Sequence, residues 1–358
     1  MSSLADRLRG VIRPRGEGGP RVEGGPAGPP LPEDELEIDR RGVPSGAPAA
    51  EILGGDLRDG YMVVERKYSP GHRHGRMSVA DSLPSSESPW GALGVLLDGA
   101  APRERLVFID LETTGLAGGA GTCAFLVGCG WFDRGSFRVR QFFLSAYAGE
   151  RALLDALREV AGDAGTIVSY NGKTFDLPLI ETRFLFHRME TPFAGVPHLD
   201  MLHPARRLWR SDEDETGGSG CRLTNIEAAQ LGYVREDDVP GFEIPARYFH
   251  YVRSGDARPL CGVLEHNRLD ILALAALTAR AAQVLAGPPD GATPREALGV
   301  ARLFERVGRT DEALTWYTRA EHGRGARADA LRARALLLRR LRRYADAAQA
   351  WRDLLGVR

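Results

Sequence analysis

The sequence contains few of the features that mark secreted, membrane or zinc-cluster proteins. Its four cysteines lack Cys-x-x-Cys spacing, and residues 1–16 are polar with four arginines. This pattern offers neither a disulfide framework nor a signal peptide, so we expect a reduced, cytoplasmic protein. The most apolar stretch, 271–287, is interrupted by Arg280 and is short for a membrane span. We therefore expect no membrane partner.

Lysine and net charge are also scarce. Only Lys67 and Lys173 occur among 47 basic residues, and the formal net charge is −1. This balance excludes a chain-wide basic surface, so any surface for nucleic acid must be local. Residues 293–358 carry 15 arginines and 8 acids, a difference of +7 that leaves −8 elsewhere. Solvated helix surfaces or a phosphate-tracking stripe would both explain this excess.

Two carboxylates stand at the end of an apolar run. Asp110 and Glu112 follow the hydrophobic segment that begins at Leu106. Alternate residues of a β-strand share a face, so both side chains should point the same way. Two like charges there predict a site for a divalent cation, which takes oxygen ligands. Exposure of both acids at a strand end would also satisfy the pattern.

Two later segments supply further acids. Asp176 ends Asn171-Gly172-Lys173-Thr174-Phe175-Asp176, which follows the β-like run 166–170 and precedes a predicted helix with Pro178 in its first turn. Farther on, His266 and Asp270 are four residues apart at the start of an apolar helical stretch. That spacing places them on one helix face. The four acids can therefore converge on one site.

These motifs resemble those of the DEDD exonuclease superfamily, namely Asp-x-Glu, Asn-x-x-x-Phe-Asp and a Tyr or His shortly before an Asp. Over about residues 53–286 the chain is similar to the YprB-type ribonuclease H-like family, through Gly118-Gly119-Ala120-Gly121-Thr122, His203-Pro204-Ala205-Arg206-Arg207 and His266-Asn267-Arg268-Leu269-Asp270. The resemblance implies an α/β fold, a mixed sheet flanked by helices, and 3′–5′ exonuclease activity on DNA or RNA.

The resemblance also implies the roles of individual residues. Two divalent cations, Mg²⁺ or Mn²⁺, would be held by four acids: Asp110, Glu112, Asp176 and Asp270. Contacts to nucleic acid, at an end or on a single strand, would come from Thr113, Thr114, Gly115, Asn171 and Phe175. Lys173, one of only two lysines, is a candidate for a phosphate contact, and a solvated loop lysine is the alternative. His266 is the candidate that activates water. In the histidine branch the His stands five residues before the last Asp, where this chain has Glu265. The alternative role for His266 is a hydrogen bond to a neighbouring acid or a phosphate.

The composition divides the chain into four parts: a disordered Gly/Pro-rich leader (1–50), an N-terminal extension (51–101), a ribonuclease H-like domain (102–286) and a helical segment (293–358). We assign no role to the extension. In the last part, Ala313-x-x-x-Tyr317 recurs as Ala347-x-x-x-Trp351, a shift of 34 residues. This period resembles that of tetratricopeptide repeats and suggests a protein partner; a plain helical bundle is the alternative.

The sequence thus predicts a metal-dependent nuclease, with 3′–5′ exonuclease action as the leading function. A structure-specific endonuclease would use the same acids. A catalytically weak nucleic-acid-binding or scaffold protein would keep the fold and recruit partners through the helical segment. The complete set of acids argues against this third hypothesis, and the shifted histidine is the feature that retains it.

Overall fold

The computed structural model describes residues 48–84, 89–97, 102–103, 105–115, 121–210, 220–288, 291–323 and 325–357. The predicted leader lies outside the described residues, apart from 48–50. Seven strands form one mixed sheet in the order β1-β2-β7-β6-β5-β8-β9. Their bounds are β1 Asp56–Leu57, β2 Tyr61–Tyr68, β5 Leu106–Thr113, β6 Ala124–Asp133, β7 Ser136–Leu144, β8 Thr166–Ser169 and β9 His198–Asp200.

Strand β5 is an inner strand of the sheet and lies between β6 and β8. It pairs antiparallel with β6 and parallel with β8, and its residues from Leu106 to Ile109 are buried. Strands β6 and β7 form the predicted hairpin, whose turn uses Arg134 at φ 47° and Gly135 at φ 79°. Positive φ at both turn residues matches the twist of the paired strands. The predicted mixed sheet is therefore confirmed.

The N-terminal extension is part of this sheet. Strand β2 pairs antiparallel with β7 along all eight of its residues, and the short β1 pairs with β2 at the edge. A second hairpin, β3 Arg73–His74 and β4 Met77–Ser78, follows β2. The extension and residues 102–286 thus share one sheet, which gives the extension a structural role that its composition did not reveal.

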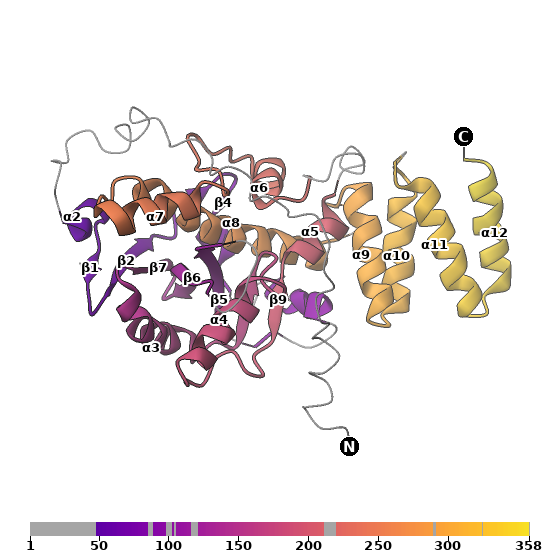
Figure 1. Ribbon diagram of the computed structural model, residues 1–358. Helices are drawn as coiled ribbons and strands as arrows, with labels where there is room; N and C mark the ends of the chain where they lie inside the picture. Colours follow the sequence, from indigo (N-terminus) through magenta and orange to yellow (C-terminus); the bar gives the residue numbers. More distant parts are fainter. Residues whose placement is uncertain are drawn as a thin grey trace, which may run out of the picture. The chain divides into compact units, whose positions relative to one another are not determined.

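Helices cover both faces of the sheet (Figure 1). On β5, Val107 and Ile109 pack into a core with α3 Glu150–Ala161, α4 Asp176–Phe186 and α7 Ile244–Ser254. Phe108, on the opposite face, packs into a core that contains much of α8 Leu260–Ala286. Asp110 and Glu112 share the face of Phe108, because strand residues alternate. Helix α8 therefore crosses the acidic end of β5.

Helix α8 begins at Leu260, earlier than the predicted stretch, and has 27 residues. By length and composition it is the single helix among the described residues that could cross a membrane. However, 78% of its apolar window is buried inside the protein. Its hydrophobic residues are thus occupied in packing against the sheet and neighbouring helices.

The C-terminal part consists of two helix pairs: α9 Pro294–Arg306 with α10 Thr310–Ala320, and α11 Arg327–Arg340 with α12 Tyr344–Leu355. Helices α10 and α12 begin 34 residues apart, as the sequence period predicts. Ala313 and Ala347 are both buried at equivalent positions. Figure 1 shows the four helices in succession, beyond two short helices, α5 Leu202–Leu208 and α6 Leu223–Leu231.

Candidate functional site

Asp110 is fixed at the end of β5 by an amide on α8. Asn267 Nδ2 donates a 2.8 Å hydrogen bond to Asp110 Oδ2, and Gln141 Nε2 on β7 donates one of 2.9 Å to Asn267 Oδ1. Gly128 lies opposite Asp110 on β6, and a Cβ there would be 2.3 Å from Asn267 Oδ1. The missing side chain at position 128 therefore makes room for the amide that orients Asp110.

His266 and Asp270 face the same region from α8, as their spacing predicts. His266 Nε2 is 3.5 Å from Asp270 Oδ2 and 3.9 Å from Glu112 Oε1. Its other nitrogen, Nδ1, is 2.7 Å from Asp238 Oδ1. The imidazole is thus held by one acid outside the predicted set, with Nε2 directed at two acids within it.

Asp176 begins α4, at the end of a loop held by Asp200. The backbone N–H groups of Asn171 and Lys173 donate hydrogen bonds of 2.7 and 3.1 Å to the Asp200 carboxylate. A Cβ at Gly172 would be 2.9 Å from Asp176 Oδ2, so glycine lets the loop turn beside the carboxylate. Asp200 therefore shapes the loop that presents Asp176.

Burial and nearby carboxylates raise the pKa values of three of the four acids. Burial, followed by the charges of Asp270, Glu112 and Asp176, raises the pKa of Asp110 well above its usual value. Burial raises the pKa of Glu112 to about 8, with His266 opposing and Asp270 and Asp176 adding to the rise. Burial, then Asp200 and Asp270, raises the pKa of Asp176 to about 7. The site concentrates more negative charge than its neighbours neutralise.

Arg235 is the largest feature of the site that sequence analysis missed. Its buried guanidinium is 2.6 Å from Asp270 Oδ1, 2.7 Å from Glu227 Oε2 and 3.3 Å from Asp238 Oδ2. On the far side of Glu227, Oε1 is 2.5 Å from His74 Nε2 on β3. His74, Glu227 and Arg235 therefore form a continuous row of side-chain contacts from the β3–β4 hairpin to Asp270. Arg235 lies between α6 and α7 with no motif around it, so the sequence offers no sign of this contact.

The predicted contacts after β5 serve first to order their own loop. Thr113 Oγ1 donates a 3.0 Å hydrogen bond to the carbonyl of Gly115, and Thr114 Oγ1 accepts one of 3.0 Å from the Cys123 N–H. The Thr114 N–H in turn donates to the Cys123 carbonyl. These bonds hold the backbone of residues 113–115 beside Asp110 and Glu112.

The predicted contacts before α4 divide into two kinds. Asn171 has φ 67°, and its side chain accepts a 3.4 Å hydrogen bond from Thr174, so it helps to form the turn. Lys173 is exposed, and Phe175 is 59% exposed although it is a large aromatic residue. Lys173 and Phe175 therefore remain accessible to a ligand beside Asp176.

The donor set suits a hard divalent cation. Asp110, Glu112, Asp176 and Asp270 are carboxylates from three separate elements, and their mutual repulsion would be relieved by bound positive charge. Across the described ranges, no three His, Cys, Asp or Glu side chains form a ready-made metal-binding group. The fit therefore rests on the oxygen donors and on their unneutralised charge.

Comparisons with known proteins agree with the fold. A profile of the RNase H superfamily matches residues 107–282. The protein YprB of Bacillus subtilis (strain 168) is 33% identical over 310 residues, which cover 83% of this chain and 72% of YprB. The family B DNA polymerase of the hyperthermophilic archaeon Pyrobaculum calidifontis aligns with 67% of this chain and 29% of its own, at 13% identity and a TM-score of 0.38, too low to carry an argument. The chain therefore belongs to the family of YprB, with an RNase H-like fold.

Proposed function

We propose that the protein is a metal-dependent nuclease that hydrolyses phosphodiester bonds, with 3′–5′ exonuclease action. The observation that carries the proposal is the cluster of acids at the end of β5, in which burial and neighbouring carboxylates raise the pKa values of Asp110, Glu112 and Asp176. Such a cluster is costly unless cations compensate it. The match of residues 107–282 to the RNase H superfamily supports hydrolysis of phosphodiester bonds. The resemblance of the motifs to those of DEDD exonucleases supports the 3′–5′ direction of cleavage.

Asp110, Glu112, Asp176 and Asp270 would hold two Mg²⁺ or Mn²⁺ ions. When bound, such ions supply an activated water and stabilise charge on the attacking and leaving oxygens. Asn267 keeps the Asp110 carboxylate oriented. The backbone of residues 113–115, which is ordered by its own hydrogen bonds, would bind a terminal nucleotide.

His266 would exchange a proton at Nε2. Burial opposes its charged form, but the hydrogen bond to Asp238 and the charges of Asp270 and Glu112 raise its pKa to about 9. When protonated, the imidazolium donates hydrogen bonds and balances part of the negative charge of the neighbouring carboxylates. His266 can accept a proton at neutral pH once positive charge offsets that of Asp270 and Glu112.

One observation favours a second candidate, a protein that binds nucleic acid without efficient cleavage. The Arg235 guanidinium already forms an ion pair with Asp270 at 2.6 Å, so a positive charge lies beside one of the four acids. This arrangement would weaken cation binding at Asp270 unless the pair opens.

The test compares wild type with Asp110→Asn on 3′- and 5′-labelled single-stranded DNA and RNA, in Mn²⁺, Mg²⁺ or EDTA. We expect a metal-dependent ladder that shortens from the 3′ end and is absent in the variant. Asp155→Asn, on the outer side of α3, is the matched control and should cleave normally. Internal cuts would indicate an endonuclease; binding without cleavage would support the second candidate and reject the enzyme.

A further inference from the structure

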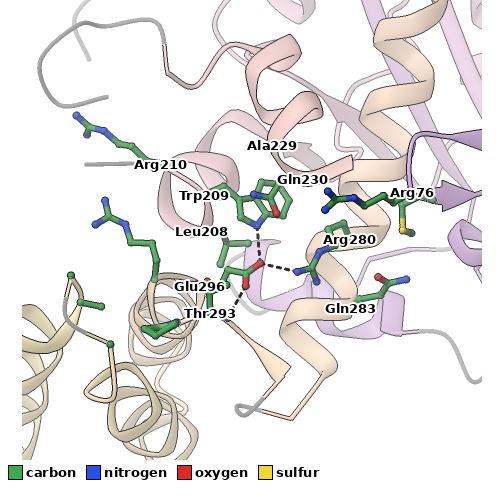
Figure 2. Close-up of a pocket in the computed structure, with 16 residues that line it drawn as sticks. Arg76, Leu208, Trp209, Arg210, Ala229, Gln230, Arg280, Gln283, Thr293 and Glu296 are labelled. Atoms are coloured by element: carbon green, nitrogen blue, oxygen red, sulfur yellow. Dashed lines mark hydrogen bonds and ion pairs between the residues drawn. The ribbon is translucent and has the colours of Figure 1, made fainter. Parts of the chain in front are cut away.

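A large cavity lies where the α5, α6 and α8 helices meet the start of α9. Its volume is about 880 Å³, and the turn between β3 and β4 contributes Arg76 to its lining. Figure 2 shows Trp209, Arg280 and Glu296 joined near its centre by hydrogen bonds and an ion pair. None of the four acids of the candidate site lines this cavity.

The lining is strongly basic. It contains four arginines, Arg76, Arg210, Arg280 and Arg295, and one acid, Glu296, for a net charge of +3. Glu296 is buried and already occupied, since it accepts from Arg280 at 3.0 Å and from Trp209 Nε1 at 3.2 Å. The acid therefore cannot neutralise the other three arginines of the lining.

Two of these arginines have no hydrogen bond or ion pair from their side chains within the described part of the chain, namely Arg76 and Arg210. In Figure 2 the Arg76 side chain extends toward Trp209, whereas Arg210 projects from the other end of the group. Gln230, Gln283 and other neutral polar groups lie in the same lining. Guanidinium groups with amide donors beside them match the oxygens of phosphate groups.

Helix α8 connects the cavity to the candidate active site. Arg280 follows Asp270 by ten residues, which corresponds to about 15 Å along a helix axis at about 1.5 Å per residue. Stacked nucleotides advance by about 3.4 Å each, so this separation corresponds to about four nucleotides. A strand with its end at the acids could therefore place later phosphates at the cavity.

We propose that this cavity binds backbone phosphates of a single-stranded nucleic acid several nucleotides away from the bond to be cut. The inference rests on the proposed function and extends it to the substrate's length: long strands would be held at two places and very short ones at the acids alone. Because phosphates carry no base identity, the cavity would add affinity without sequence preference.

The test uses the full chain, so the acidic residues 212–215 that follow Arg210 in the sequence are present throughout. Binding of a labelled single strand of about 20 nucleotides, as DNA and as RNA, is measured in EDTA over a range of salt concentrations. Arg76→Gln/Arg210→Gln removes the two arginines without described partners. Arg280 is kept, because its loss would leave the buried Glu296 without its ion pair.

We expect the double variant to bind the long strand about tenfold more weakly, since two partly exposed charge contacts are lost. The slope of log affinity against log salt should fall by about 1.4, at about 0.7 for each phosphate contact to a single strand. Cleavage of a dinucleotide in Mn²⁺ should be unchanged. Arg58→Gln/Arg253→Gln removes the same charge from exposed residues outside the cavity and should keep the wild-type slope.

Unchanged affinity and slope in the cavity variant would overturn the inference, and so would equal losses in the two double variants. Each result leaves the proposed function standing if wild type still cuts the dinucleotide. Conversely, wild type that binds the long strand through the two arginines but cuts nothing would support the inference and reject the nuclease. Melting temperatures of both variants check that the fold is retained.

Discussion

Asp176 links pH to stability through a simple balance of protons. Its pKa is about 7 in the folded chain against an ordinary value of 3.8, because it is buried and faces Asp200 and Asp270. The folded state thus keeps a proton that the unfolded chain releases. This carboxyl loses its stabilising contribution as pH rises from about 4 to about 7 and changes little above that.

We therefore expect Asp176→Asn to melt higher than wild type in EDTA, by about 2–5 °C at pH 8 and by less at pH 5. Adding Mn²⁺ should raise the melting temperature of wild type more than that of the variant, because a ligand that binds the folded state stabilises it. Differential scanning fluorimetry across pH measures both effects. A difference that does not grow with pH would contradict the linkage.

Gly128 is the residue where the shape of the site depends most on a missing side chain. A Cβ there would stand 2.3 Å from Asn267 Oδ1, in the middle of the Gln141–Asn267–Asp110 hydrogen bonds. Gly128→Ala should destabilise the protein by roughly 1–3 kcal/mol through overpacking and should reduce cleavage. Gly71→Ala, with open space around its Cβ, is the control for chemical denaturation and activity. Normal stability of Gly128→Ala would show that the amide can move aside.

Sequence reasoning reached the acids but not their surroundings. The spacing of Asp110 with Glu112 and of His266 with Asp270 follows from strand and helix periodicity, so their shared faces were predictable. Arg235 could not be found this way, because its contacts join loops and helices that only the folded chain brings together.

At the scale of elements, the buried charges tie β3, α6 and α8 together. Glu227 is fully buried between His74 and Arg235, and Arg235 reaches Asp270. Arg235→Met would leave Glu227 and Asp270 without their main counter-charge. Since breaking a buried pair costs about 3–5 kcal/mol, we expect a loss of this order in urea unfolding at neutral pH without metal.

A second variant distinguishes the effect of losing Arg235 on Glu227 from its effect on Asp270. Glu227→Gln/Arg235→Met removes the buried charge at position 227, so part of the lost stability should return. Asp270 still lacks its guanidinium in the double variant, and Mn²⁺ should therefore stabilise both variants more than wild type. Equal stability of Arg235→Met and wild type would refute the importance of the pair.

The elements themselves were predicted unevenly, for a physical reason. The hairpin of β6 and β7 carries apolar runs around a tight turn, which are local signals. Strand β2 includes Glu65, Arg66 and Lys67, and its strand conformation depends on pairing with β7, about 70 residues later. Such a strand is defined by a distant partner, so the extension showed no clear pattern in the sequence.

For the whole molecule, the first C-terminal helices continue the core of the sheet. Phe108, Leu277, Leu298 and Trp316 belong to one buried cluster. Helix α9 also approaches α5 closely, since a Cβ at Gly299 would be 2.3 Å from a backbone oxygen of α5. By contrast, a small separate cluster lies between the last two helices, formed by Ala335, Leu338, Ala347 and Ala350.

Two truncations should consequently behave differently. Ending the chain after Arg342 removes α12 and uncovers mainly the small cluster, so we expect a soluble, cooperatively folded protein with wild-type cleavage of a dinucleotide. Ending it after Pro288 removes α9 to α12 and exposes Leu208, Trp209 and the apolar side of α8. We therefore expect aggregation or a melting temperature lower by more than about 5 °C. Size-exclusion chromatography and thermal melts compare the two. A stable monomer from the shorter chain would show that the sheet and its helices fold without α9 to α12, and that α9 is not a required part of the core.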